Sequence, residues 1–383
     1  MRILFVTEIS PFPLNGGEKL RSFGLIKILS ELGHEVIGVI RNSSGVDLKK
    51  YSMSGVRFSV IQNNHSRFIN LLGLSYFFKK REIVKIIQKE LKDKNIDIVV
   101  LDFRFLGQYI SIFKKKNIPV IYGTHNAQSN LTNQIPTSNI INWLIKKQNL
   151  YLQIIHEKIY FNKANILITV TKKDALFYQN KVNKDKIYVV PNFLDEFIYD
   201  KKYKKEDYFI MPANFKAFMN YEGLKWLINE VWDDELDAKS KLLIVGVNSM
   251  ESFERIKKGK KFKNIIAVGE VDDMLTYIGK AKAVIIPLLH GSGARLKCLE
   301  AMALGISIIS TSKGVEGINS KFFIVADTAI EFRNALLSFS GNVHDGENIK
   351  KEFETYYSLN ANKELMKNII YLAYNSVTRI NQN

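Results

Sequence analysis

The sequence is poor in cysteine and proline and lacks long apolar runs. Its 383 residues include one cysteine, Cys298, and seven prolines. One thiol cannot form an internal disulfide, which fits a reducing compartment. No stretch approaches the roughly 18 uninterrupted apolar residues of a membrane span, and the run Ile3–Val6 is too short for a signal-peptide core. These absences predict a cytoplasmic protein, free or peripheral on the inner face of the cytoplasmic membrane.

Acidic residues are scarce in the first half of the chain. Residues 1–193 hold 29 Lys and Arg against 13 Asp and Glu, a net charge of +16 out of +17. A genome-wide lysine bias would load both halves, yet residues 194–383 are nearly neutral. The imbalance predicts an anionic partner for the first half, such as a membrane surface. Nucleic acid is not expected, because no zinc motif or RNA-binding signature is visible.

Short apolar runs rich in β-branched residues alternate with helical patterns through both halves. Such runs are typical of strands buried on both faces, as in parallel sheets. Their alternation with helices predicts doubly wound α/β domains. The expected strands are residues 3–8, 36–40, 96–101, 120–122 and 166–170 in the first half, and 208–211, 242–245, 265–268, 284–288, 307–310 and 322–325 in the second.

A domain boundary is expected in the polar stretch that follows Pro191 and Asn192, where the charge balance also changes. The predicted domains are an N-terminal Rossmann-like domain at 1–193 and a C-terminal one at 194–358. The helical pattern at about 359–383 is expected to pack back on the first domain.

The segment 287–317 carries the most specific chemical pattern. A Gly-Ser-Gly loop leads into a helix expected to start near Ala294, with Arg295 and Lys297 in its first turns. Free helix N–H groups and fixed cations are what a diphosphate requires. Glu300, one turn further on, can accept hydrogen bonds from ribose hydroxyls. The alternative is a surface helix with an exposed Lys297–Glu300 pair of little energetic value, which leaves the glycine loop unexplained.

The run G-S-G-A-R-L-K-C-L-E-A-M-A-L-G, residues 291–305, resembles the donor-site signature of glycosyltransferase family 4, a retaining family with the GT-B fold. Residues 1–21, 189–195 and 264–273 resemble the opening strand and glycine loop, the interdomain segment and the nucleobase loop of the same family. The resemblance implies two Rossmann-like domains facing a central cleft, with residues 1–193 on the acceptor side and residues 194–358 binding the nucleotide-sugar donor. It further implies transfer of a hexosyl unit from a UDP- or GDP-sugar with retention, with no cofactor and no metal.

The resemblance also implies roles for individual residues. His125, in G-T-H-N-A, would be catalytic beside the reacting sugar. Gly269, Glu270 and Val271 would border the nucleobase, and Glu300 would hold the ribose. The diphosphate would be bound by Gly16, Gly17, Lys216, Gly293, Arg295 and Lys297, and the sugar and acceptor would meet Arg21, Asn126 and Ser292.

Some of these assignments have a plainer reading. Gly16 and Gly17 also suit an ordinary turn, Arg21 could stay solvated, and Lys216 could be merely exposed. Ser292 stands where the family often has a glutamate, so the donor sugar stays open. The six histidines show no metal-ligand spacing.

Residues 67–94 combine aromatic and aliphatic side chains with lysines. This composition suits an anionic bilayer surface, or equally a core helix with a solvated charged side. The family setting implies a saccharide or lipid-linked acceptor in bacterial surface polysaccharide or glycolipid synthesis. The alternatives are a GT-B nucleotide-sugar epimerase, an inactive sugar-nucleotide-binding subunit, or a basic nucleic-acid-binding protein. The segment 67–94 described above includes Phe68, Leu71, Leu72, Leu74, Tyr76, Phe77 and Phe78, followed by Lys79, Lys80 and Arg81.

Overall fold

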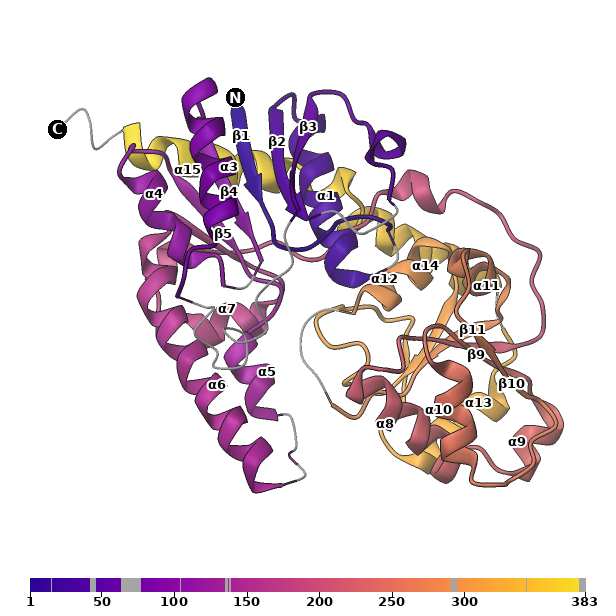
Figure 1. The fold of residues 1–383 in the computed structure, drawn as a ribbon. Helices are drawn as coiled ribbons and strands as arrows, with labels where there is room; N and C mark the ends of the chain where they lie inside the picture. The colour runs from indigo at the N-terminus through magenta and orange to yellow at the C-terminus, as the bar shows by residue number, and fades with distance from the viewer. Residues whose placement is uncertain are drawn as a thin grey trace. The chain divides into compact units, whose positions relative to one another are not determined.

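The chain folds into two compact units, shown in the computed structural model of Figure 1. The first unit comprises residues 1–192 and 362–383, and the second comprises residues 193–361. The structure describes residues 1–14, 16–41, 46–62, 77–103, 105–134, 137, 139–290, 295–341 and 343–378.

A parallel sheet forms the core of the first unit. Its strand order is β3-β2-β1-β4-β5-β6-β7, so the chain reverses direction across the sheet after β3. Every neighbouring pair in this sheet is parallel. The strands are β1 (Arg2–Val6), β2 (Glu35–Arg41), β3 (Val56–Ile61), β4 (Ile98–Asp102), β5 (Val120–Gly123), β6 (Ile166–Thr169) and β7 (Ile187–Val189).

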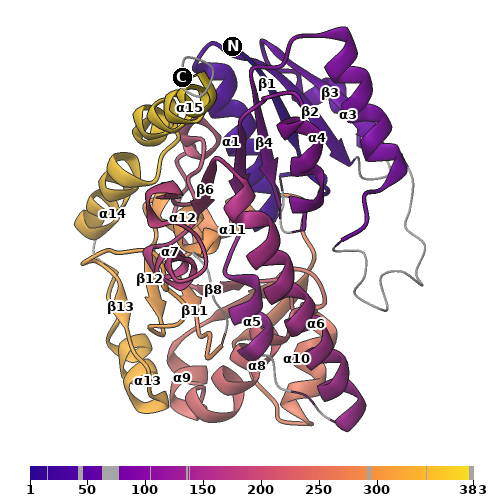
Figure 2. The same cartoon turned by 90° about the vertical axis from the view of Figure 1, so that its left-hand side faces the viewer.

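Helices cover both faces of this sheet (Figure 2). On one face Leu4 and Val6 of β1 pack in one core with Ile83 and Ile87 of α3 and Phe113 of α4. Helices α1 and α15 lie on the other side, where α15 contacts both α1 and β4. The helices are α1 (Gly17–Glu31), α3 (Arg81–Asp93), α4 (Ile110–Lys114), α5 (Gln128–Gln134), α6 (Ile140–Tyr160), α7 (Lys172–Gln179) and α15 (Lys363–Thr378).

The second unit repeats the design with the strand order β10-β9-β8-β11-β12-β13. Its strands are β8 (Phe209–Pro212), β9 (Leu242–Val245), β10 (Ile265–Gly269), β11 (Ala283–Ile286), β12 (Ser307–Ser310) and β13 (Ile324–Val325). Its helices are α8 (Phe218–Trp226), α9 (Asp234–Lys239), α10 (Ser249–Lys257), α11 (Met274–Lys280), α12 (Leu296–Ala303), α13 (Ala329–Ser338) and α14 (Val343–Tyr356), and a π-helical turn, Leu227–Val231, continues α8.

Two doubly wound parallel α/β domains are therefore confirmed. The first strand ends at Val6 rather than near residue 8, and strands β3 and β7 were not expected. Both are edge strands, and most of their residues are only half-buried, so their sequences lack a continuous apolar run. Among the described residues no helix is long and apolar enough to cross a membrane.

Candidate functional site

The carboxyl edge of the second sheet positions the basic residues expected at the donor site. Helix α12 begins at Leu296, and Arg295 is its N-cap residue rather than part of its first turn. The expected start near Ala294 is therefore two residues early. Ala294, Ser292 and Gly293 lie outside the described residues.

Lys297 is held by the neighbouring helix α8. Its Nζ donates a hydrogen bond to Asn220 Oδ1 at 3.1 Å, and Asn220 Nδ2 donates to the Asn214 carbonyl at 2.8 Å. Helix α8 lies close to the end of β11, because a Cβ added to Gly223 would lie 2.6 Å from the Pro287 carbonyl oxygen. This close approach fixes the lysine beside the start of α12. Nothing in the sequence pairs Asn220 with Lys297.

The ionisable groups of this cluster are strongly perturbed. Burial raises the pKa of Glu300 to about 7, although the Lys297 charge acts in the opposite direction. Burial and the adjacent Arg295 lower the pKa of Lys297 to about 8. Both side chains remain half-buried rather than fully enclosed. With the described residues the Glu300 carboxylate makes no hydrogen bond, so its oxygens are available to hydroxyl donors.

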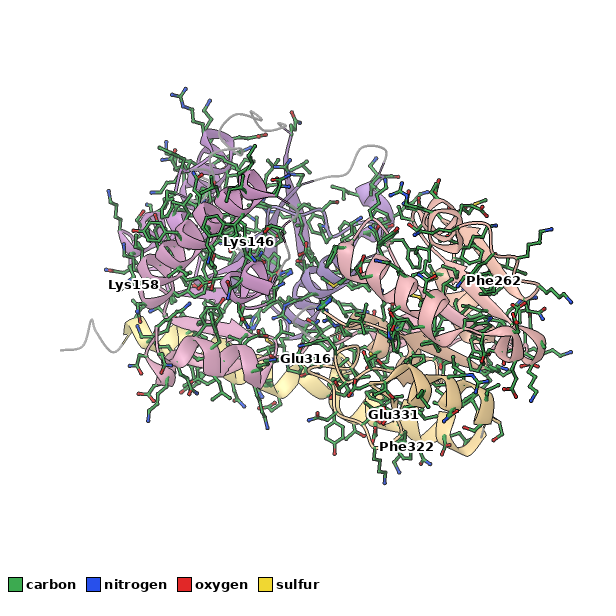
Figure 3. All side chains as sticks on the ribbon, turned by 90° about the horizontal axis from the view of Figure 1, so that it is seen from below. Lys146, Lys158, Phe262, Glu316, Phe322 and Glu331 are labelled. Atoms are coloured by element: carbon green, nitrogen blue, oxygen red, sulfur yellow. The ribbon has the colours of Figure 1, made fainter. Side chains whose placement is uncertain are left out.

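Arg295 adds a second cation to this cluster. Burial lowers the pKa of its guanidinium, and the charge of Glu316 acts against that shift. Glu316, labelled in Figure 3, also pairs with Lys313 at 3.3 Å. Arg295 and Lys297 thus present two positive charges within five positions of the half-buried Glu300 carboxylate. That combination suits a ligand carrying both phosphate and hydroxyl groups.

The other donor-site candidates of this unit lie on the same edge of the sheet. Lys216 is exposed in the loop before α8, four residues before Asn220. Gly269 ends β10 with φ +93°, and its N–H donates to Ser249 Oγ at 2.9 Å. Glu270 is exposed and Val271 is half-buried. Strands β9 and β8 separate β10 from β11, so these residues reach a shared ligand only if it extends along the edge.

In the first unit, Arg21 is buried rather than solvated. It lies one turn into α1, whose N-cap is Gly16 and whose first residue is Gly17. Its Nη1 donates to the Val190 carbonyl at 3.3 Å and to Asn192 Oδ1 at 3.0 Å. Its Nε and Nη2 are buried with no hydrogen-bond partner among the described residues. A buried guanidinium with unused donors is suited to an anionic or hydroxyl-rich ligand.

His125 contacts a fully buried aspartate, Asp102, which the sequence pattern did not single out. Asp102, the last residue of β4, lies 3.2 Å from His125 Nε2 and accepts a 2.6 Å hydrogen bond from Ser22 Oγ. Burial alone would raise the pKa of Asp102, but the charges of His125 and Arg21 and the Ser22 hydroxyl hold it below its usual range. His125 Nδ1 is buried and has no partner in the described part of the chain. The cluster therefore presents an oriented imidazole with one nitrogen unused.

The features that position His125 were partly visible in the sequence. Asp102 closes the buried run I-V-V-L-D, and a carboxylate at a strand end is a feature that could have been noted. Phe103 packs edge-on against the imidazole, with ring centroids 5.5 Å apart. Asn126 follows His125 and is half-buried. Thus Arg21 and His125 share Asp102 as a neighbour.

Comparison with known proteins matches each unit to a domain of one enzyme class. Residues 21–196 match the model of Glycosyltransferase Family 4, and residues 206–342 match that of Glycosyl transferases group 1. The two halves of the chain are the domains of a glycosyltransferase of the family 4 and group 1 type. The transferase thus carries its basic cluster at α12 inside the group 1 domain, and His125 inside the family 4 domain.

Similar proteins support the fold of this glycosyltransferase over nearly its whole length. A protein of Klebsiella pneumoniae, described as an uncharacterized 44.6 kDa protein in the cps region, is 23% identical over 89% of this chain and 92% of its own. Sucrose-phosphate synthase from Thermosynechococcus elongatus superposes with a TM-score of 0.76 at 14% identity, covering 98% of this chain and 100% of that one. HepE from Anabaena, in complex with UDP and glucose, gives 0.66 at 13% identity, covering 96% and 99%. The fold is therefore that of GT-B glycosyltransferases.

Proposed function

We propose that this glycosyltransferase moves a hexosyl unit from a UDP- or GDP-sugar to a saccharide or lipid-linked acceptor, with retention at the anomeric carbon. The proposal is carried by one observation, the Arg295, Lys297 and Glu300 cluster at the start of α12. Two cations fit a diphosphate and a desolvated carboxylate fits a ribose. The complex of HepE with UDP and glucose supports this choice of ligand.

The residues of the second unit suit stabilisation of the leaving group. Arg295 and Lys297 would compensate the charge that grows on the departing nucleoside diphosphate, the largest electrostatic requirement of such a transfer. Because two side chains supply this compensation, we propose that no divalent cation takes part. Lys216 and the glycines Gly16, Gly17 and Gly293 are proposed to bind the same diphosphate, and residues 269–271 to border the base.

The residues of the first unit suit the sugar and acceptor end of the reaction. We propose that His125 contacts the reacting sugar, with Asp102 holding its ring, and that Arg21, Asn126 and Ser292 lie on the sugar and acceptor side. Asp102 is a positioning residue, since His125 lies between it and any ligand at Nδ1. The Asp102 carboxylate lies next to Nε2 of His125, and this contact fixes the orientation of the imidazole ring.

The biological setting follows from the relative in the cps region of Klebsiella pneumoniae. A gene product in such a region supports a role in bacterial surface polysaccharide or glycolipid assembly. The acceptor would then be a growing saccharide, free or lipid-linked.

Ligand-induced stabilisation of the full chain tests the donor site. UDP, GDP, ADP, CMP and their sugars would be compared, with magnesium and with a chelator. A ligand that binds only the folded protein adds about 2.7 kcal/mol at a hundredfold excess over its Kd. We expect a clear rise in Tm with UDP or GDP and their sugars in both buffers, and its loss in Glu300→Ala.

Glu230→Ala is the matched control, because Glu230 is an exposed glutamate of the same unit. It should keep the full nucleotide response. No stabilisation of the wild type by any nucleotide would contradict the proposed donor site. Dependence of the response on magnesium would contradict the metal-independent form of the proposal.

A further inference from the structure

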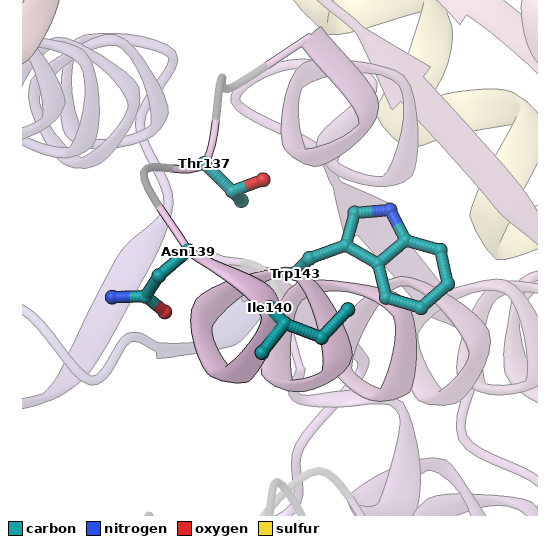
Figure 4. Close-up of a pocket in the computed structure, with 4 residues that line it drawn as sticks. All are labelled: Thr137, Asn139, Ile140 and Trp143. Atoms are coloured by element: carbon teal, nitrogen blue, oxygen red, sulfur yellow. The ribbon is translucent and has the colours of Figure 1, made fainter.

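The first two turns of α6 carry a cluster of large apolar side chains exposed to solvent. Ile140, Ile141 and Leu144 are 67%, 65% and 55% exposed, and Trp143 and Ile145 also lie open. In the close-up of Figure 4 the Trp143 indole stands out from the helix beside a shallow pocket lined by Ile140, Thr137 and Asn139. These five apolar residues, Ile140, Ile141, Trp143, Leu144 and Ile145, are called the α6 tip below.

The exposure is densest at one end of the helix, since further along α6 exposed apolar side chains occur singly, at Tyr151, Ile154 and Ile159. Further along α6, Gln153, His156 and Glu157 are buried, and the helix contacts α5 and the turn Phe161–Lys163. Apolar side chains gathered in this way on a folded surface mark an interaction site rather than scattered surface residues. The described part of the chain covers the base of α6 but leaves its tip open.

Positive charge borders the α6 tip. Lys146 and Lys147 follow it directly, and the Lys147 ammonium lies 5.7 Å from the Trp143 ring centroid. Lys146, labelled in Figure 3, is tied back to the Asn133 carbonyl at 2.9 Å. Residues 103–156 contain no Asp or Glu. The α6 tip thus combines exposed apolar side chains, an indole and two adjacent lysines, with no acidic residue nearby in the sequence. This combination is typical of helices that bind the interface of an anionic bilayer.

We propose that the α6 tip inserts into the head-group region of an anionic lipid bilayer. Lys146 and Lys147 would then lie at the level of the lipid phosphates, and Trp143 at the boundary of the acyl chains. A second copy of the chain fits the tip less well, because it would bring the same lysines against one another with no acid to pair them. The helix does not meet the requirements of a membrane span, so the contact is interfacial.

This inference goes beyond sugar transfer, because it concerns where the first unit binds and not what the second unit binds. It also differs from the expectation built on residues 67–94. Of the residues of that segment, 67–76 lie outside the described ones, and α3 begins only at Arg81. In the described part of that segment Phe78 is exposed, whereas the α6 tip gathers five exposed apolar side chains within six positions.

Trp143 supplies a direct probe of the contact. The chain has three tryptophans, and the other two, Trp226 and Trp232, are buried in the second unit. Full-length protein would be mixed with vesicles of phosphatidylglycerol and phosphatidylcholine, or of phosphatidylcholine alone. We expect a blue shift of the emission, and quenching by brominated lipid, with the anionic vesicles only. Both effects should disappear in Trp143→Phe.

Vesicle co-sedimentation of variants gives the second test. The double variant Ile141→Glu with Leu144→Glu should bind anionic vesicles at least tenfold more weakly. Lys147→Glu should also bind more weakly, and binding of the wild type should fall in about 1 M salt, where charges are screened beyond about 3 Å. Leu176→Glu is the matched control, because Leu176 is 62% exposed on α7 of the same unit. It should bind within twofold of the wild type.

Three outcomes would overturn the inference. They are an unchanged Trp143 emission with anionic vesicles, equal sedimentation of the double variant and the wild type, or a blue shift without vesicles that grows with protein concentration. The last would assign the tip to a second copy of the chain. Nucleotide stabilisation measured on the same double variant separates this result from the donor site. In the wild type, nucleotide binding without vesicle binding contradicts only the membrane contact, whereas absence of nucleotide binding contradicts the proposed function.

Discussion

Two side chains of the donor cluster have pKa values close to neutrality. The pKa of Glu300 is raised to about 7 because its carboxylate is desolvated. The pKa of Lys297 is lowered to about 8 by burial and by the charge of Arg295. A diphosphate needs the ammonium form of Lys297. Ribose hydroxyls need the carboxylate form of Glu300 as acceptor. Donor binding therefore requires both groups to be charged.

The affinity for a sugar nucleotide should be highest between about pH 7 and 8. Below this window the raised pKa of Glu300 leaves it protonated, and above it the lowered pKa of Lys297 leaves it neutral. Either loss should weaken binding by up to about tenfold per pH unit, since one pKa unit corresponds to about 1.4 kcal/mol. Calorimetric titration with the sugar nucleotide at a series of pH values measures this change in affinity. Glu300→Gln should lose the acid limb and keep the basic one, and a flat profile in the wild type would contradict these assignments.

Asp102 provides the residue-scale test in the first unit. In Asp102→Asn the buried carboxylate that faces His125 and Arg21 is lost, so the imidazole loses its orientation and its balancing charge. We expect the rate of donor turnover to fall by about 10²-fold. Nucleotide affinity should stay unchanged, because the donor cluster lies in the other unit.

Ser22→Ala is the milder companion variant. It removes the 2.6 Å hydrogen bond to the Asp102 carboxylate, worth about 1.5–3 kcal/mol, but leaves the charge beside His125 in place. The loss in rate should therefore be smaller than that of Asp102→Asn. Equal losses in Ser22→Ala and Asp102→Asn would show that the packing around Asp102 matters and its charge does not.

Sequence position decides which site residues could be predicted. Arg295, Lys297 and Glu300 lie within six consecutive positions, so a local pattern reveals them together. Asn220 meets Lys297 across 77 positions, and Asp102 meets His125 across 23. Such contacts depend on how helices and strands pack in the folded unit. A sequence without that packing cannot indicate them.

Helix α8 is the element that sets the donor cluster, because one face of it carries both Asn220 and Gly223. Asn220 binds Lys297, and Gly223 lies close to Pro287, the residue after β11. Gly223→Ala should push this helix away from the Pro287 carbonyl, since the new Cβ would lie 2.6 Å from the oxygen. Overpacking of this kind costs about 1–3 kcal/mol. Denaturant unfolding should show that loss, together with weaker nucleotide binding.

Lys225→Ala is the control on the same helix. Lys225 is exposed and forms only a 3.6 Å pair with Glu222, so its removal should change stability by no more than about 0.5 kcal/mol. Equal stability of Gly223→Ala and the wild type would show that α8 can shift without loss.

The elements that were predicted share one physical property. Strands such as β4, β6 and β9 are buried along their entire length, so their sequences are apolar runs, interrupted only by the polar last residues of β4 and β6, Asp102 and Thr169. The edge strands β3 and β7 have half-buried residues. Pairing with one neighbouring strand, and not burial, makes them strands. Tertiary context of this kind is absent from a local pattern.

At the scale of the whole molecule, the net charge and the proposed donor cluster lie in different units. Nearly all of the net charge of +17 lies in residues 1–193, whereas the donor cluster lies in residues 193–361. A donor nucleotide should therefore stabilise the second unit more than the first, to which only Gly16 and Gly17 of the proposed diphosphate site belong. In Trp143→Phe the remaining tryptophans, Trp226 and Trp232, report on that unit alone.

Thermal unfolding of this variant, followed by its fluorescence, should show a higher midpoint with nucleotide. Cleavage of sites in the first unit by a protease should be slowed much less by the same ligand. Equal protection of both units would mean that the nucleotide stabilises the whole chain as one cooperative body.

Transfer itself is the central claim, and product analysis tests it most directly. The sugar nucleotide that stabilises the protein most would be labelled with ¹³C at the anomeric carbon and incubated with lipid-linked and free saccharide acceptors. The account predicts release of the nucleoside diphosphate, appearance of the label in a glycoside of unchanged anomeric configuration by NMR, and loss of both in Glu300→Ala. A product of inverted configuration would contradict retention, and a bound donor that yields an epimer but no glycoside would contradict the transfer.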